Sequence, residues 1–308
     1  MRTRPSRRPL RRRPTVRAVA LAGAVAGVVA GALSACAAPF GGSGDETPAG
    51  PSVVTSFYPL AYVAERIAGE QARVTDLTRP GQEPHDLELT VRQTAVVADA
   101  DVVVYAAGFQ AAVDEAVASA DPTHVVNASE VGDAVGDDPH LWLDPARFAR
   151  VASAVEQALA AADPQHAGGY AARLRSLRGD LDELDASFRD GLASCRIDTV
   201  VVSHDAFGYL GRRYGFSVVG INGLSPDAEP SPAHLRRLQD LIRRDGITTV
   251  FSEELASRAL ADSLAGDLGL RTAVLDPVEG LSDATADQDY LSLMRRNLAA
   301  LEEANQCR

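Results

Sequence analysis

The sequence predicts an α/β protein made of two doubly wound lobes, each built on a parallel sheet and joined to the other by one long linking helix. Val-rich runs bounded by turn residues alternate with helical patterns over residues 52–128, and the same alternation returns over residues 199–304. This order implies parallel strands with helices on both faces of each sheet. The stretch 145–193, which has no strand pattern, separates the two series.

Each lobe is expected to contain four strands. The buried strand patterns lie at 52–57, 73–78, 101–106 and 123–128 in the first lobe and at 199–204, 217–221, 248–253 and 272–276 in the second. Helices are expected at 59–69, 90–99, 110–120, 206–214, 232–245, 256–268 and 287–304. No internal sequence repeat aligns the two lobes.

A single helix is expected to join the lobes. Asp163 and Pro164 break the central stretch, and large apolar side chains then recur at helical spacing, at Leu174, Leu177, Leu181, Leu184 and Phe188. The pattern predicts a helix of roughly 27 residues, about 40 Å long, whose apolar stripe packs on the lobes. We therefore predict an N-terminal lobe at 52–164, the linking helix at 165–194 and a C-terminal lobe at 195–308.

The segment before residue 52 is not expected to belong to the fold. An arginine-rich stretch, a small apolar stretch and Cys36 follow one another, as in an export signal. The segment Leu33-Ser34-Ala35-Cys36 resembles the bacterial lipobox, in which the cysteine is lipidated. A transmembrane anchor is the alternative, although the apolar stretch is short and weakly apolar. The expected parts are a signal peptide at 1–35, a lipid on Cys36 and a flexible Gly- and Pro-rich tether at 36–51.

The cysteine count predicts one disulfide. The chain has three cysteines, and a lipid on Cys36 leaves Cys195 and Cys307. An even pair in an exported protein is typical of a disulfide, which here would tie the C-terminus to the start of the second lobe. Two unpaired thiols are the alternative.

The charge of the chain is divided unevenly between the leader and the rest. The formal net charge is −12, but eight of the 30 basic residues, all arginines, lie within residues 2–17, and residues 1–35 contain no acidic residue. The rest, with 22 arginines and 42 acidic residues, carries −20. A nucleic-acid binder needs a basic face, so this balance excludes that class and favours a cation as partner.

Three histidines lie in distinctive segments at or after the ends of predicted strands. His85 lies in EPHDLELT, His140 in DPHLWLDP and His204 in SHDAFGYL. Ligands of doubly wound sheets bind outside the carboxyl ends of strands, where these imidazoles and the carboxylates of Asp276 and Glu279 fall. Three imidazoles and one carboxylate form a tetrahedral donor set that suits Zn²⁺. The ligands are scattered, so spacing alone leaves structural roles open for each histidine.

These segments, together with SHDAFGYLGRRYG, AEPSP and LDPVEGL in the same order, resemble the metal-binding lipoproteins of bacterial ABC importers, the ZnuA/TroA-like solute-binding family. The resemblance covers about residues 52–307. It implies two α/β lobes, one long linking helix and a metal in the interlobe cleft. It also implies that His85, His140 and His204 are metal ligands. Manganese-binding relatives have an acidic residue at the position of His204, so histidine here favours zinc.

The fourth ligand is left open between two carboxylates. Some relatives use an aspartate at the position of Asp276, and others a glutamate at the position of Glu279. Glu279 is preferred, because Asp276 directly precedes Pro277 and could instead brace the turn. Glu229 and Glu253, and after them Asp205 and Trp142, are candidates for orienting the ligand imidazoles. The acidic loop at 130–138 has no histidine and is interpreted as a solvated loop.

The resemblance implies a function outside the cytoplasm. We expect an exported, monomeric subunit of an ABC importer, lipid-anchored on the outer face of the cytoplasmic membrane. It would capture Zn²⁺ as transported ligand and deliver it to a permease and its ATPase, without catalysis. A manganese- or iron-binding importer subunit is the first alternative, and a zinc-dependent hydrolase the second. Ser203, His204 and Asp205 cannot form a triad by themselves, because consecutive strand residues point to alternate faces.

Overall fold

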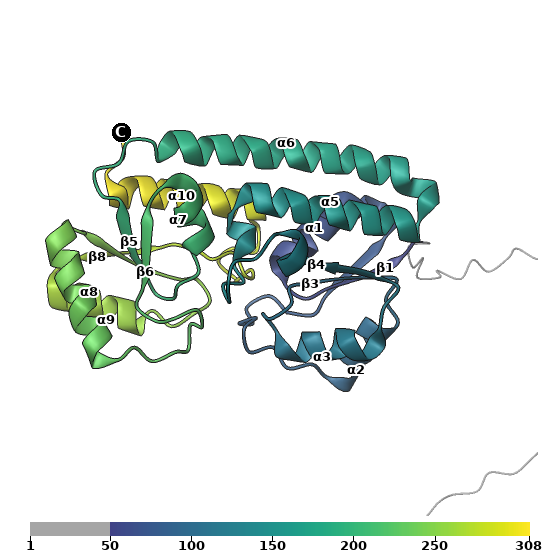
Figure 1. Cartoon of the computed structure of the whole chain (residues 1–308), viewed down its shortest axis with the longest axis horizontal. Coiled ribbons are helices and arrows are strands. Elements are labelled where there is room, and N and C mark those ends of the chain that lie inside the picture. Colours follow the sequence, from purple (N-terminus) through teal and green to yellow (C-terminus); the bar gives the residue numbers. More distant parts are fainter. Residues whose placement is uncertain (1–49) are drawn as a thin grey trace, which may run out of the picture. The chain divides into compact units, whose positions relative to one another are not determined.

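The computed structural model describes residues 50–308 (Figure 1). The predicted signal peptide, the lipidation at Cys36 and the tether apart from its last two residues lie outside the described residues. No helix within residues 50–308 is both long enough and apolar enough to span a membrane.

The first sheet has four parallel strands in the order β2-β1-β3-β4. The second sheet has the order β6-β5-β7-β8 and is also parallel, so both sheets have the same topology although their sequences do not align as repeats. The predicted fold class and its eight strands are confirmed. The strands are β1 Ser52–Thr55, β2 Arg73–Asp76, β3 Val102–Tyr105, β4 His124–Asn127, β5 Thr199–Val202, β6 Ser217–Gly220, β7 Thr249–Ser252 and β8 Arg271–Val274.

Helices connect and cover the strands of the first sheet. They are α1 Tyr58–Ala68, α2 Val91–Ala98, α3 Ala111–Ala120, the short α4 Ala128–Val131 and α5 Pro145–Ala162. The stretch that lacked a strand pattern thus begins with α5. Asp144 caps this helix by accepting hydrogen bonds from the backbone N–H groups of Ala146 and Arg147, and Pro145 occupies its first turn.

The predicted long helix is α6, Ala167–Gly191, of 25 residues. Its buried residues Leu177, Leu181, Leu184 and Phe188 come from the predicted apolar stripe. The helix packs against α5 and α1 beside the first sheet, and against α10, Tyr290–Asn305, which follows the last strand of the second sheet (Figure 1). The other helices of the second half are α7 Gly208–Tyr214, α8 Pro232–Asp245 and α9 Ala259–Leu268.

One hydrophobic core cluster contains residues from both sheets, for example Val53 and Val102 from the first and Val200 and Val202 from the second. Tyr290 of α10 reaches into this shared core. It is fully buried, and its hydroxyl donates a hydrogen bond of 2.6 Å to the carbonyl of Trp142. The halves that carry the two sheets are therefore joined by apolar packing as well as by α6.

The predicted disulfide between Cys195 and Cys307 is present and closes a loop with a sequence separation of 112 residues. Backbone hydrogen bonds reinforce the same junction: the N–H groups of Arg196 and Ile197 donate to the carbonyl of Asn305, and that of Arg308 donates to the carbonyl of Ser194.

Replacing both cysteines, Cys195→Ser with Cys307→Ser, should lower the free energy of unfolding by about 2–4 kcal/mol, because the unfolded chain regains the entropy of an unclosed loop. Urea unfolding of the oxidised parent, the reduced parent and the variant measures this loss. The variant should be insensitive to reductant and should unfold at the midpoint of the reduced parent. Equal midpoints for the oxidised and reduced parent would contradict the prediction.

Candidate metal centre

Four side chains from separate parts of the chain converge on one point. His85 lies in the loop after β2, and His140 directly precedes a 3-10 turn at Leu141–Leu143. His204 and Glu279 lie beyond the ends of β5 and β8. Each side chain offers one ligand atom, and all four atoms lie within 4.8 Å of one another. The structure thus brings the three predicted histidines together with Glu279.

The spacing of these donor atoms fits a tetrahedral cation. Oε1 of Glu279 lies 3.4 Å from Nε2 of His85, 3.1 Å from Nε2 of His140 and 3.6 Å from Nε2 of His204. The Nε2 atoms of His140 and His204 are 3.2 Å apart. Bonds of about 2.0–2.1 Å to Zn²⁺ imply donor–donor distances of about 3.3–3.4 Å in a regular tetrahedron. Four of the six donor–donor distances bracket that value, and the two from His85 to the other imidazoles are within 4.8 Å.

The donors are removed from water. The side chains of His140 and His204 are fully buried, that of Glu279 is 2% exposed and that of His85 is 12% exposed. Nε2 of His85 and Oε1 of Glu279 are buried without a well-formed hydrogen bond. Such atoms are costly to bury unless something else binds them. A divalent cation at the centre of the four donors would bind both.

Two of the rings are oriented by carboxylates through their Nδ1 atoms. Oδ1 of Asp138 forms a hydrogen bond of 2.9 Å with Nδ1 of His140. Oε1 of Glu253 lies 2.7 Å from Nδ1 of His204 as an ion-pair contact, without the angles of a well-formed hydrogen bond. Each carboxylate also accepts a hydrogen bond from the backbone N–H of the same histidine. This arrangement holds each ring with Nε2 pointing to the centre, as is usual for histidines that bind metals.

The sequence identified only one of these two orienting carboxylates. Glu253 lies where the prediction placed it, whereas Glu229, the other glutamate named as a candidate, is exposed to solvent. The interpretation of 130–138 as a solvated loop is wrong for Asp138, whose side chain is 13% exposed. Its position two residues before His140, in the segment DPH, is the signal that could have found it.

Aromatic side chains form one wall of the centre. The ring of His85 packs edge-on against that of Phe109, with the ring centres 4.6 Å apart. The ring centres of His140 and Trp142 are 5.3 Å apart. Trp142 Nε1 donates a hydrogen bond of 2.7 Å to the carbonyl of Pro277. This bond links the segment of His140 to the segment that carries Glu279. It therefore helps to fix the relative position of two donors that come from opposite halves of the chain.

Comparison with known proteins identifies the family. A family model described as the zinc-uptake complex component A, periplasmic (ZnuA), matches residues 53–304. The chain belongs to the ZnuA family. The zinc-binding lipoprotein AdcA of Streptococcus pneumoniae strain R6 is 33% identical over 283 residues, which cover 82% of this chain and 55% of AdcA. The high-affinity zinc uptake system protein ZnuA of Bacillus subtilis is 32% identical over 276 residues, which cover 82% of this chain and 86% of that protein.

Solved structures agree with this assignment. The Zn(II)-bound ZnuA-like domain of S. pneumoniae AdcA matches with a TM-score of 0.73 at 33% identity, over 83% of this chain and 99% of that one. The laminin-binding protein Lmb of Streptococcus agalactiae, described as bifunctional with adhesin and metal transporting activity, matches with a TM-score of 0.75 at 29% identity. The match covers 83% of this chain and 99% of Lmb. The chain spans about half the length of the AdcA relatives it matches.

Asp276, the alternative fourth ligand, is not among the four converging donors of this ZnuA-family chain. Its Oδ1 accepts a hydrogen bond of 2.8 Å from the backbone N–H of Val278, and its own N–H donates to Asn297. Val278 has a φ of 58°, a left-handed conformation that is unfavourable for a β-branched residue. Asp276 therefore braces the turn that presents Glu279. Burial raises the pKa of Asp276 to about 7.

Protons occupy the centre in the absence of metal. Burial by itself would lower the pKa of His204, but hydrogen bonds and charge from Glu253 and Glu279 raise it to about 10. Burial would likewise raise the pKa of Glu279, but the three imidazoles outweigh it and hold that pKa well below its usual range. At neutral pH the metal-free site therefore holds an ionised Glu279 facing at least one protonated ring, and a cation must displace that proton.

The two candidate carboxylates differ in their expected effect on zinc binding. Glu279→Gln should weaken Zn²⁺ binding by more than about 100-fold, because it removes the anionic donor itself, a larger loss than that of an outer partner. Asp276→Asn keeps the oxygen that accepts from Val278 and should bind Zn²⁺ within a few fold of the parent. Titration against a chromogenic chelator measures both. The reverse order of the two affinities would show that Asp276 is the ligand.

Zinc affinity should rise with pH. The pKa of His204 in the metal-free fold is about 10, above its unfolded value, so its ion pairing stabilises the metal-free fold fully below about pH 6.5 and is lost as the pH rises towards 10. Because Zn²⁺ needs a neutral ring, it competes with this proton, and binding should release about one proton or more per ion near neutral pH. Calorimetry in buffers of different ionisation enthalpy counts them. Binding without proton release would contradict the assignment.

Proposed function

We propose that this chain is the extracytoplasmic substrate-binding subunit of an ABC importer, which captures Zn²⁺ and delivers it to a permease driven by an ATPase. The observation that carries the proposal is the largely buried cluster of three imidazoles and one carboxylate, whose ligand atoms lie within 4.8 Å of one another. Neutral imidazole nitrogens suit Zn²⁺ better than Mn²⁺, which prefers oxygen donors. The names of the AdcA and ZnuA relatives, which describe zinc binding and zinc uptake, support the same substrate.

A binding role is favoured over catalysis because four protein donors complete the coordination of Zn²⁺. A catalytic zinc keeps one position for water or substrate, and a structural or carrier site does not. Ser203, the nucleophile of the rejected triad, instead donates a hydrogen bond to the carbonyl of Phe251. In this proposal zinc is the cargo of the protein, and it is bound and released without a chemical reaction.

The proposal includes the placement of the protein. An export signal at 1–35 and a lipid on Cys36 would leave a monomeric binding protein on the outer face of the cytoplasmic membrane, on a tether that ends at residue 51. AdcA of two S. pneumoniae strains is named a lipoprotein, which supports this anchoring. The division into lobes at 52–164 and 195–308, with a linking helix at 165–194, is part of the same proposal and assigns donors to both lobes.

Competitive titration tests the choice of metal. The purified protein, stripped with chelator, should bind Zn²⁺ at least about 100-fold more tightly than Mn²⁺, and His204→Ala should remove most of this preference because it deletes a nitrogen donor. In the parent bacterium, loss of the gene should lower uptake of Zn²⁺ from zinc-limited medium and leave Mn²⁺ uptake unchanged. Preference for Mn²⁺ would instead establish a manganese importer subunit.

A further inference from the structure

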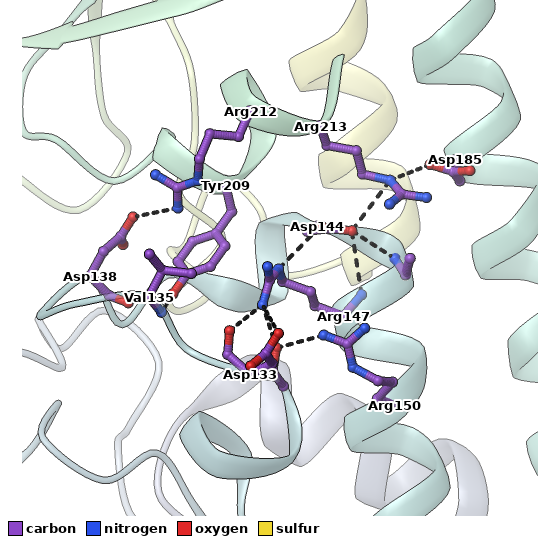
Figure 2. A network of polar contacts seen from close by, with 12 residues as sticks. Asp133, Val135, Asp138, Asp144, Arg147, Arg150, Asp185, Tyr209, Arg212 and Arg213 are labelled. Atoms are coloured by element: carbon purple, nitrogen blue, oxygen red, sulfur yellow. Dashed lines mark hydrogen bonds and ion pairs between the residues drawn. The ribbon is translucent and has the colours of Figure 1, made fainter. Parts of the chain in front are cut away.

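Asp138, which orients His140, is itself held from the other half of the chain. Its Oδ1 faces Nδ1 of His140 at 2.9 Å, and its Oδ2 lies 3.3 Å from Nη2 of Arg212 in α7 (Figure 2). One carboxylate therefore connects the imidazole on one side with the guanidinium on the other. The acidic segment around Asp138 follows the first sheet, whereas α7 belongs to the second sheet.

Tyr209, on the same short helix, fixes the backbone on which Asp138 sits. The Tyr209 hydroxyl donates a hydrogen bond of 2.8 Å to the carbonyl of Asp138 and accepts one of 2.7 Å from the N–H of Val135. The guanidinium carbons of Arg212 and Arg147 lie 4.5 Å and 5.1 Å from the centre of the Tyr209 ring, within the range of cation–π contact (Figure 2). The ring is 1% exposed. Segment 135–138 is thus pinned to α7 at both ends.

Gly208 lets this contact form. A Cβ at position 208 would lie 2.8 Å from Oδ2 of Asp138 and 3.1 Å from Nη1 of Arg212. Real Cβ atoms essentially never approach another atom as closely as 2.8 Å, so a side chain here would shift the Asp138 carboxylate, and 3.1 Å would crowd the guanidinium. The first residue of α7 is therefore small where Asp138 must approach.

We propose that Arg212 and Tyr209 are positioning residues for the metal ligand His140, and that they act through Asp138. The proposal rests on the proposed function. Helix α7 begins four residues after His204. The short segment 204–212 therefore carries His204 itself and, through Tyr209 and Arg212, also sets the orientation of His140. Displacement of α7 from the acidic segment would loosen His140 and speed the release of Zn²⁺.

The variant Arg212→Gln tests the link. The side chain of Arg212 is 51% exposed, so its ion pair contributes little to stability and the variant should unfold like the parent. Zinc affinity should fall about tenfold, the lower end of the range for losing an outer partner of a metal ligand, with a matching rise in the dissociation rate into excess chelator. Arg212→Lys keeps the charge and should restore part of the loss. Arg271→Gln, at a distant half-exposed ion pair, is the matched control and should bind as the parent does.

A double-mutant cycle decides whether Arg212 acts through Asp138. In an Asp138→Asn background, Arg212→Gln should weaken zinc binding by less than about twofold, because the carboxylate it holds is gone. Gly208→Ala should weaken binding, whereas Gly266→Ala, where a Cβ meets nothing within 4 Å, should not. Unchanged affinity in Arg212→Gln, or an equal loss in both backgrounds, would overturn the inference. A parent that does not bind Zn²⁺ would overturn the proposed function as well.

Discussion

The carboxylate of Glu279 is almost completely buried, and a buried carboxylate is stable only where positive charge and hydrogen bonds reach it. Three imidazoles surround this carboxylate and hold its pKa well below the usual range, and a bound cation would stabilise it by direct coordination. Much of the surrounding structure serves to keep these four groups within contact. Trp142 ties the His140 segment to Pro277, and Asp138 and Glu253 fix two rings from behind.

The two sheets contribute to this centre in equivalent ways. Their strand orders are the same, and each supplies two donors from segments that follow its strands. Donors that come from two sheets meet only if the halves of the chain keep their relative position. The shared core, the packing of α6 on α5 and α10, and the hydrogen bond from Tyr290 to Trp142 maintain that position. Interlobe packing is therefore part of the binding site, although most of it lies away from the donors.

Local sequence patterns predicted the strands well, because strands buried on both faces of a parallel sheet are Val-rich and bounded by turn residues. The same patterns were less complete for the helices. The four-residue helix α4 was missed, and α5 was not assigned bounds of its own, although the break at Asp163 and Pro164 that separates it from the long helix was predicted. The prediction of a solvated side chain was wrong for Asp138. It rested on the acidic composition of the loop, which does not reveal the partners of a single carboxylate. Its partners, His140 and Arg212, come from different halves of the chain.

The sequence by itself determined the chemistry of the site: three imidazoles in recognisable segments, two candidate carboxylates near the last strand, and a disulfide pair. Only the tertiary structure decided which carboxylate joins the imidazoles. Asp276 and Glu279 are three residues apart and both carry a carboxylate, so sequence spacing cannot distinguish them. The left-handed turn at Val278, braced by Asp276 itself, sends Glu279 to the rings. The physical reason is that a donor set depends on distances between atoms, and those distances are set by the packing of two sheets that are remote in sequence.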